Sequence, residues 1–271
     1  MKVALLLCGQ PRRALETCDI IKKLIIEPNN ADVFMHMWYD DDDLYMEKGE
    51  IDRGICDIKK GIDKELVEFY KPKGVIVEKQ KFKQFNNYNC EYYKFPEKYI
   101  NNYLNCGKNK ELSRDEMKLQ VLRYTHLSQL YSNFKCNLIK EEYSLGNNIL
   151  YDCVIKLRYD AFPKVPLICS NYTMNYIYYE DIGQPDNIIS DWFNMGSNTI
   201  MNIYSSIFLN FEYLNNNKMY YKRKERINSS GVAVDDNCTI SPEYLIRDIM
   251  YKYKVPCKPI KIGIDVMDHK N

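Results

Sequence analysis

A chain of 271 residues is long enough to bury one large core, and its formal net charge of +1 is nearly balanced. That balance argues against a protein whose main work is to neutralise a nucleic-acid backbone, so no nucleic-acid partner is expected. Ten cysteines are spread along the chain. No two of them form a Cys-x-x-Cys pair, the spacing found in zinc ribbons and redox motifs, so neither motif is indicated. We expect reduced thiols, several of them in the core.

The apolar runs are too short for a membrane helix. None approaches the roughly 20 residues that a membrane span needs. The run Val3–Cys8 is also too short for the hydrophobic region of a signal peptide, and it leads straight into Gly-Gln-Pro-Arg-Arg. We therefore expect a soluble, cytoplasmic protein with no transmembrane segment.

The first part of the chain alternates strand and helix patterns. Runs of apolar residues predict buried strands, and apolar residues at helical spacing lie between them. A strand-helix-strand-helix-strand order favours a parallel sheet with helices on its faces. The expected elements are a strand at Val3–Cys8, a helix over 12–26 that stops before Pro28, a strand at Asp32–Met37, a helix at Ile62–Tyr70 and a strand at Gly74–Glu78.

The remainder of the chain continues with longer elements. Residues 80–112 show little periodicity, and we expect an irregular, mobile excursion there. Ser113 and Glu116 form a capping box that begins a helix with a mostly apolar stripe through Phe134. Further on we expect a strand at Tyr151–Asp160, a strand at Ile188–Ser197, a helix at Asn198–Tyr213, a helix begun by Pro242 and reaching about Tyr253, and a strand at Lys258–Val266.

Several stretches together resemble one enzyme family. They occur in family order and cover nearly the whole chain, and the set is similar to nucleotide-sugar glycosyltransferases with the GT-A fold. That family is found in bacterial surface-polysaccharide clusters and in large DNA viruses. The matching stretches are Leu7-Cys-Gly-Gln-Pro-Arg12, Asp32-Val-Phe-Met-His-Met-Trp38, Ser128-Gln-Leu-Tyr-Ser132, Tyr151-Asp-Cys-Val-Ile-Lys-Leu-Arg-Tyr-Asp160, Ser190-Asp-Trp-Phe-Asn-Met-Gly-Ser197 and Ser241-Pro-Glu243.

The resemblance implies an α/β fold that is GT-A-like (Rossmann-like), with a mixed, mostly parallel central sheet flanked by helices. It implies a single domain over residues 1–271, in which 1–160 form the nucleotide-sugar-binding half and 161–271 the acceptor-side half. The implied partners are a UDP- or GDP-sugar donor and a glycan acceptor. For a viral member the cytoplasm would be that of the host.

The metal motif of the family is altered in this chain. GT-A enzymes usually carry Asp-x-Asp at the end of a mid-chain strand, whereas this chain has Arg158-Tyr159-Asp160. The resemblance makes Asp160 the expected ligand of Mn²⁺ or Mg²⁺, since Asp152 lies at the wrong end of the strand. Arg158 can instead pair with phosphate bidentately. A structural Arg158–Asp160 pair is the third alternative, because residues two apart on a strand share a face.

The donor site is expected at the carboxyl ends of the first two strands, where open α/β sheets bind nucleotides. Gly9 suits close approach to a base or ribose, whereas the arginines suit a diphosphate, unless they are simply solvated at a helix start. His36 and Trp38 are either ligand contacts or core residues. Asp40 can bond a ribose hydroxyl, as can its three acidic neighbours. The predicted nucleotide-sugar contacts are Gly9, Gln10, Arg12, Arg13, His36, Trp38, Asp40 and Arg158.

An inverting transferase needs a carboxylate that takes a proton from the attacking hydroxyl. Asp191 precedes an Asn-Met-Gly-Ser turn at the position that resembles the acceptor-side wall of GT-A sites, and it is the first candidate. Glu243 is the second candidate, although an acidic residue in the first turn of a helix also stabilises the helix dipole without any chemistry.

One other class of function remains as an alternative, and two more are disfavoured because the motifs that they need are missing. A non-catalytic nucleotide- or carbohydrate-binding protein on the same scaffold is compatible with the incomplete Asp-x-Asp. A nucleotidyl- or phosphoryl-transferring enzyme would need a G-x-x-x-x-G-K-[ST] loop, and a nicotinamide-dependent oxidoreductase would need G-x-G-x-x-G; the chain has neither motif.

Overall fold

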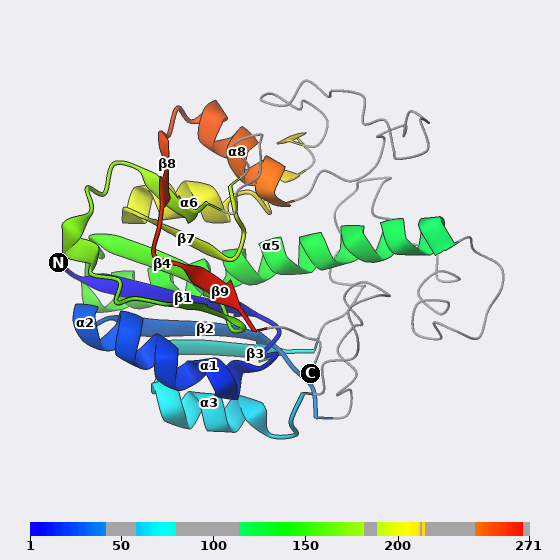
Figure 1. Ribbon diagram of the computed structural model, residues 1–271, viewed down its shortest axis with the longest axis horizontal. Coiled ribbons are helices and arrows are strands. Elements are labelled where there is room, and N and C mark those ends of the chain that lie inside the picture. Colours follow the sequence, from blue (N-terminus) through cyan, green and yellow to red (C-terminus); the bar gives the residue numbers. More distant parts are fainter. Residues whose placement is uncertain (42–57, 80–113, 182–188, 212, 215–241, 268–271) are drawn as a thin grey trace.

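The computed structural model shows an α/β protein built on a seven-stranded central sheet with helices on both faces (Figure 1). The predicted class, a mixed and mostly parallel sheet flanked by helices, is confirmed, and this arrangement is consistent with the GT-A-like fold that the sequence suggests. The structure describes residues 1–41, 58–79, 114–181, 189–211, 213–214 and 242–267.

The central sheet contains one strand that runs against its neighbours. β7 is antiparallel to both β4 and β6, whereas the other pairs in this sheet are parallel. A separate two-stranded sheet pairs β5 (Ala161–Pro163) with β9 (Ile264–Val266). The order across the central sheet is β3 (Gly74–Glu78), β2 (Asp32–Trp38), β1 (Val3–Gly9), β4 (Cys153–Arg158), β7 (Phe193–Gly196), β6 (Ile177–Glu180) and β8 (Cys257–Ile260).

The helices form two layers over the sheet. The first layer contains α1 and α3, and the second contains the long helix α5, whose amino-terminal part extends beyond the sheet in Figure 1. The described helices are α1 (Ala14–Ile21), a π-helical turn η1 (Lys22–Ile26), α2 (Glu27–Asn29), α3 (Ile62–Tyr70), α5 (Arg114–Asn147), a short 3₁₀ turn η4 (Cys169–Asn171), α6 (Asn198–Ser205) and α8 (Pro242–Lys252).

The first helical segment passes Pro28, contrary to the expectation that it stops there. It continues through η1 and α2 to Asn29. Proline has no amide hydrogen, so in an α-helix the carbonyl of Leu24 would lose its donor. The backbone amide of Leu167 donates to that carbonyl at 2.9 Å instead. A donor from a distant part of the chain therefore satisfies the carbonyl that Pro28 leaves open.

Three other expectations need correction. The expected strand over 188–197 is shorter, because only Phe193–Gly196 pair as a strand. The expected strand over 258–266 is two strands in different sheets, β8 and β9, separated by a turn in which Gly263 has a φ of 64°. The helix expected over 198–213 ends as α6 at Ser205. The predictions for 80–112 and for the Ser113 cap lie outside the described residues.

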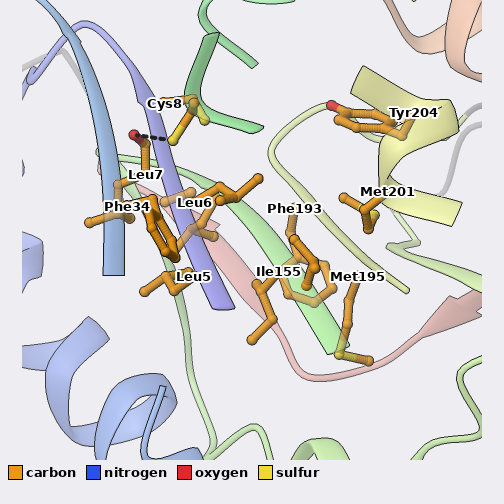
Figure 2. Close-up of a cluster of buried hydrophobic side chains, with 14 of the residues drawn as sticks. Leu5, Leu6, Leu7, Cys8, Phe34, Ile155, Phe193, Met195, Met201 and Tyr204 are labelled. Carbon is orange, nitrogen blue, oxygen red and sulfur yellow. Dashed lines mark hydrogen bonds between the residues drawn. The ribbon is translucent and has the colours of Figure 1, made fainter. Parts of the chain in front are cut away.

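The core lies on both faces of the sheet, so its strands are nearly continuous apolar runs. Leu5, Leu6 and Leu7 of β1 are almost completely buried, as are Phe34 of β2 and Ile155 of β4. Figure 2 shows these side chains next to Phe193 and Met195 of β7 and to Met201 and Tyr204 of α6. The six described cysteines are free thiols, and five of them are buried, which agrees with the expected core role.

Candidate active site

The predicted site lies at the carboxyl ends of β1 and β4. β1 and β4 are neighbours in the sheet. The chain continues from β1 to β2, which lies on the outer side of β1, whereas the strand on the outer side of β4 is β7. This change of direction is a topological switch point, where open α/β sheets bind their ligands. Because β7 is antiparallel, the segment that precedes it, which contains Asp191, reaches the same edge. The structure therefore brings residues from three strand ends together.

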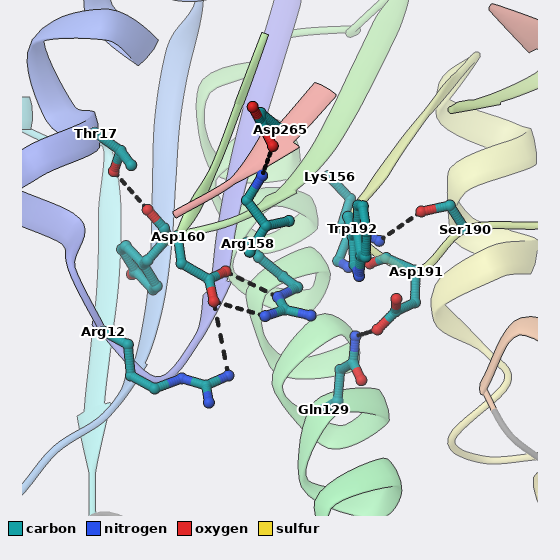
Figure 3. A network of polar contacts seen from close by, with 12 residues as sticks. Arg12, Thr17, Gln129, Lys156, Arg158, Asp160, Ser190, Asp191, Trp192 and Asp265 are labelled. Atoms are coloured by element: carbon teal, nitrogen blue, oxygen red, sulfur yellow. Dashed lines mark hydrogen bonds and ion pairs between the residues drawn. The ribbon is translucent and has the colours of Figure 1, made fainter. Parts of the chain in front are cut away.

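Arg158, Asp160 and Arg12 form an ion-pair cluster at this edge (Figure 3). The Arg158 guanidinium donates from Nε to Oδ1 of Asp160 at 2.9 Å and from Nη2 to Oδ2 at 2.6 Å. Nη2 of Arg12 lies 3.8 Å from Oδ2 of the same carboxylate. Two guanidinium groups, from β4 and from the turn after β1, thus share one carboxylate. The structural Arg158–Asp160 pair, one of the three predicted alternatives, is present, and its contact is bidentate.

The turn that carries Asp160 is fixed from two sides. The carbonyl of Tyr159 accepts a hydrogen bond from Oγ1 of Thr17 on α1 at 2.6 Å. The carbonyl of Asp160 accepts from the amide of Met267, just after β9, at 2.9 Å. These bonds hold the Asp160 carboxylate on the protein side of the two guanidinium groups, away from solvent. The side chain of Asp160 is 3% exposed, whereas those of Arg12 and Arg158 are 23% and 19% exposed.

The electrostatic environment keeps Arg158 charged. Burial opposes its charge, but the carboxylates of Asp160 and Asp191 outweigh burial and raise the pKa of Arg158. Glu243, in the first turn of α8, is a further negative charge that raises it. Glu243 is half-buried and lies near enough to contribute to the same local field. Both predicted catalytic carboxylates therefore lie in the electrostatic neighbourhood of Arg158.

Asp191 is buried and held on both its side chain and its backbone. Its Oδ2 accepts a hydrogen bond from Nε2 of Gln129 on α5, and its backbone carbonyl accepts one from Nζ of Lys156 (Figure 3). The amide of Arg158 donates to the carbonyl of Trp192 at 3.2 Å, which ties β4 to the same segment. Asp191 thus has a fixed position beside Arg158, with Oδ1 as the carboxylate oxygen that Gln129 does not contact.

Lys156 and Asn194 hold the backbone of the segment that contains Asp191, and the sequence analysis predicted a role for neither residue. They face each other across the β4–β7 pair. Lys156 is 1% exposed, and burial lowers its pKa, partly offset by the charge of Asp191. Nδ2 of Asn194 donates to the carbonyl of Ser190 at 3.0 Å. The sequence does carry a signal for the role of Lys156. A lysine inside the apolar run Cys153–Leu157 is expected to be buried, and a buried ammonium group needs a polar partner.

The other residues predicted after β1 and β2 lie in several different settings. Gly9 has a φ of 110°, a backbone conformation that favours glycine, and Gln10 after it is half-buried. Arg13 pairs with Glu16 of α1, with Nε at 2.8 Å from Oε1, so this contact turns it toward the helix. Asp40 contacts Nζ of Lys79 at 2.7 Å. Arg12, which belongs to this group, contacts Asp160.

His36 and Trp38 lie in the core beneath α5. His36 is 0% exposed, and its ring contacts Glu78 through Nε2 at 3.0 Å and Ser132 through Nδ1 at 2.8 Å. The indole nitrogen of Trp38 donates to the carbonyl of Ser128 at 3.1 Å. The ring nitrogens of both side chains are thus engaged within the fold. Of the two roles left open for them, this burial favours packing over ligand contact.

The donor set around Asp160 does not fit the expected Mn²⁺ or Mg²⁺. Both carboxylate oxygens accept hydrogen bonds from the Arg158 guanidinium, and a second guanidinium lies close by. These hard cations prefer several oxygen ligands, often carboxylates. Within the described part of the chain no group of three histidine, cysteine or acidic side chains is arranged to hold a metal ion. Two positive side chains at the carboxylate also oppose a third cation.

Comparisons with known proteins give little to extend the resemblance. No family model and no curated protein matches this chain. Among solved structures, the apo form of the glycosyltransferase GlyE from Streptococcus pneumoniae TIGR4 aligns with a TM-score of 0.38 and 6% identity. The alignment covers 95% of this chain and 44% of that one. A likeness at this level does not establish a shared fold, so the activity of GlyE is not transferred.

In the parts of the chain that the structure describes, no helix combines the length and the apolar character needed to cross a membrane.

Proposed function

We propose that this protein is a glycosyltransferase that transfers a sugar from a nucleoside-diphosphate donor, a UDP- or GDP-sugar, to a glycan acceptor. The observation that carries the proposal is the placement of Arg12 and Arg158 at the switch point of the sheet, with Asp191 beside them. Guanidinium groups bind phosphate oxygens well, and this edge is the usual place for a nucleotide in such sheets. The ordered sequence resemblance supports the same class.

In this proposal the arginines stabilise the leaving group. When the glycosidic bond to phosphate breaks, negative charge develops on the nucleoside diphosphate. The guanidinium of Arg158 is held in one orientation by Asp160, so it donates without rearrangement, and Arg12 lies beside it. Preorganised donors of this kind lower the barrier because little reorientation is needed as the charge forms.

Asp191 is the proposed general base. A carboxylate that accepts the proton of the acceptor hydroxyl must be fixed in position. Gln129 and Lys156 supply that positioning through the side-chain and main-chain oxygens of Asp191. Glu243 is the second candidate for the base. In the proposed division, residues 1–160 hold the donor and residues 161–271 supply the acceptor side.

Turnover of a donor panel tests the proposal. The purified protein is incubated with UDP- and GDP-sugars and a set of glycan acceptors, and release of nucleoside diphosphate is measured. We expect turnover with donors of one base. Asp191→Asn should lower kcat by about 100- to 10,000-fold, the usual contribution of a general base, with little change in nucleotide binding. Glu65→Gln, an exposed carboxylate on α3, is the matched control and should leave the rate unchanged.

The result also separates the alternatives. Binding of UDP or GDP without turnover of any donor would favour the non-catalytic binding protein. If Asp191→Asn retains full activity while Glu243→Gln loses it, the base is Glu243. Absence of nucleotide binding as well as of turnover would contradict the whole proposal.

A further inference from the structure

Asp160 lies on the inner side of its cluster, and the arginines lie on the outer side. Its side chain is 3% exposed, whereas Arg12 and Arg158 each retain about a fifth of their side-chain surface, at 23% and 19%. A ligand that approaches this edge from solvent meets the guanidinium groups before the carboxylate. This order is the reverse of a metal site, in which the carboxylate oxygens face the ion and the ion faces the ligand.

We propose that Asp160 is a positioning residue for Arg158, and that Arg158 and Arg12 bind the diphosphate of the nucleotide without a divalent cation. The inference rests on the proposed function, since it names how the same site holds its donor. It replaces the metal expected from the family resemblance with two side chains of this chain.

The geometry of the guanidinium supports this role. Arginine has five N–H donors in a rigid planar fork. The bonds to Asp160 use Nε and Nη2, so the edge that carries Nη1 is not engaged by this carboxylate. Two bonds to one carboxylate fix the plane of the fork, and a fixed fork loses less freedom when it binds phosphate. Asp160 therefore aims the remaining N–H groups of Arg158.

The charges in contact with Asp160 favour a diphosphate over a cation. Arg12, Arg158 and Asp160 together carry a net charge of +1, since two guanidinium groups share one carboxylate. Asp191 and Glu243 are negative charges in the neighbourhood of Arg158, and the buried ammonium of Lys156 offsets one of them. A divalent ion at Asp160 would have to displace a bidentate guanidinium and would leave that arginine next to the ion. A diphosphate instead finds compensating charge already in place.

Isothermal titration of UDP and GDP, in EDTA and then in Mn²⁺, tests the inference. We expect one nucleotide to bind in EDTA, with an affinity that Mn²⁺ changes by less than about threefold. In EDTA, Asp160→Asn and Arg158→Lys should each weaken binding by about 10- to 100-fold, the effect of losing one or two charge-assisted hydrogen bonds. Asp160→Asn keeps the side-chain shape, and Arg158→Lys keeps the charge but not the fork.

A double-mutant cycle distinguishes positioning from independent contacts. If Asp160 acts through Arg158, the double variant should bind about as weakly as Arg158→Lys alone, because the two effects are not additive. Lys59→Gln, which removes an exposed lysine that pairs with Glu65, is the control for a general charge effect. Thermal unfolding of each variant without ligand shows that it is folded.

Each contrary result has one meaning. If binding needs Mn²⁺, and Asp160→Asn weakens the binding measured in Mn²⁺, then Asp160 is a metal ligand; the inference is wrong while the proposed function stands. If Asp160→Asn binds as the wild type does in both solutions, its positioning role is excluded. If neither nucleotide binds the folded protein in either solution, the proposed function fails, and the inference fails with it.

Discussion

Replacement of His36 by glutamine should reduce the dependence of stability on pH between about pH 7 and pH 5.5. The ring is 0% exposed and contacts Glu78 and Ser132. Burial lowers the pKa of His36 below its ordinary value of 6.5; Glu78 acts against this shift, and the charge of Lys135 adds to it. With Nε2 protonated, the neutral ring donates to Glu78 and accepts from Ser132, so the fold already satisfies the uncharged form.

The sign and the size follow from proton linkage. As the pH falls through 6.5, the unfolded chain binds a proton at this histidine while the native state does so less, and the free energy of unfolding therefore decreases. If the native ring stays neutral throughout, the decrease between about pH 7 and pH 5.5 is about 1.3 kcal/mol, which is an upper limit. The lowered pKa of Glu78 adds a loss of stability only below its ordinary value of 4.5.

Urea unfolding at several pH values measures the effect. The wild-type free energy of unfolding should fall across this interval, and the fall should be smaller in His36→Gln by up to about 1.3 kcal/mol. His126→Gln and His269→Gln keep His36 and should keep its contribution to the pH dependence. Since each variant is compared with itself at different pH, its overall stability does not matter. Equal slopes for wild type and His36→Gln would refute the reasoning.

Two further predictions concern packing. Gly74→Ala should destabilise the protein by about 1–3 kcal/mol in urea unfolding, because the new Cβ would overlap Cγ2 of Ile139. The control Gly146→Ala, at a helical position with open space around it, should be neutral or stabilising. Equal effects of the two substitutions would contradict the predicted overlap. Cys136 and Cys153 should resist alkylation by iodoacetamide in the native protein and react in urea, which peptide mass spectrometry can measure. Both side chains are buried, and burial and a neighbouring thiol raise the pKa of each, so little reactive thiolate is present. Rapid labelling of the native protein would contradict this prediction.

The sequence predicts the first strands and helices well because their patterns are local. Ile62–Tyr70 and Gly74–Glu78 are bounded by glycine and proline, and the structure has them with the same bounds. The expected end of the first helix before Pro28 is wrong. The helix continues because the Leu167 amide donates to the carbonyl that Pro28 leaves open, and Leu167 is far away in the sequence. The antiparallel direction of β7 depends likewise on long-range pairing, which no local pattern reveals.

Prediction of the candidate site was partial for a similar reason. The spacing of Arg158 and Asp160 on one strand face allows their pair, but it does not decide between that pair, a metal ligand and a phosphate contact. The turn that buries Asp160 depends on bonds from Thr17 and Met267, at opposite ends of the chain. The Gln129 side chain lies in a stretch that carries the resemblance, yet its contact with Asp191 follows only from how α5 packs.

The position of β1 and β4 in the middle of the sheet has a consequence for how the site fluctuates. Both strands are hydrogen-bonded on two sides and buried on both faces, so their amides open only in the largest unfolding events of the protein. Arg158 ends β4, and Arg12 follows β1 by three residues. The guanidinium groups thus follow two strands that open only rarely, and an arriving anion finds them in place instead of having to select a rare conformation.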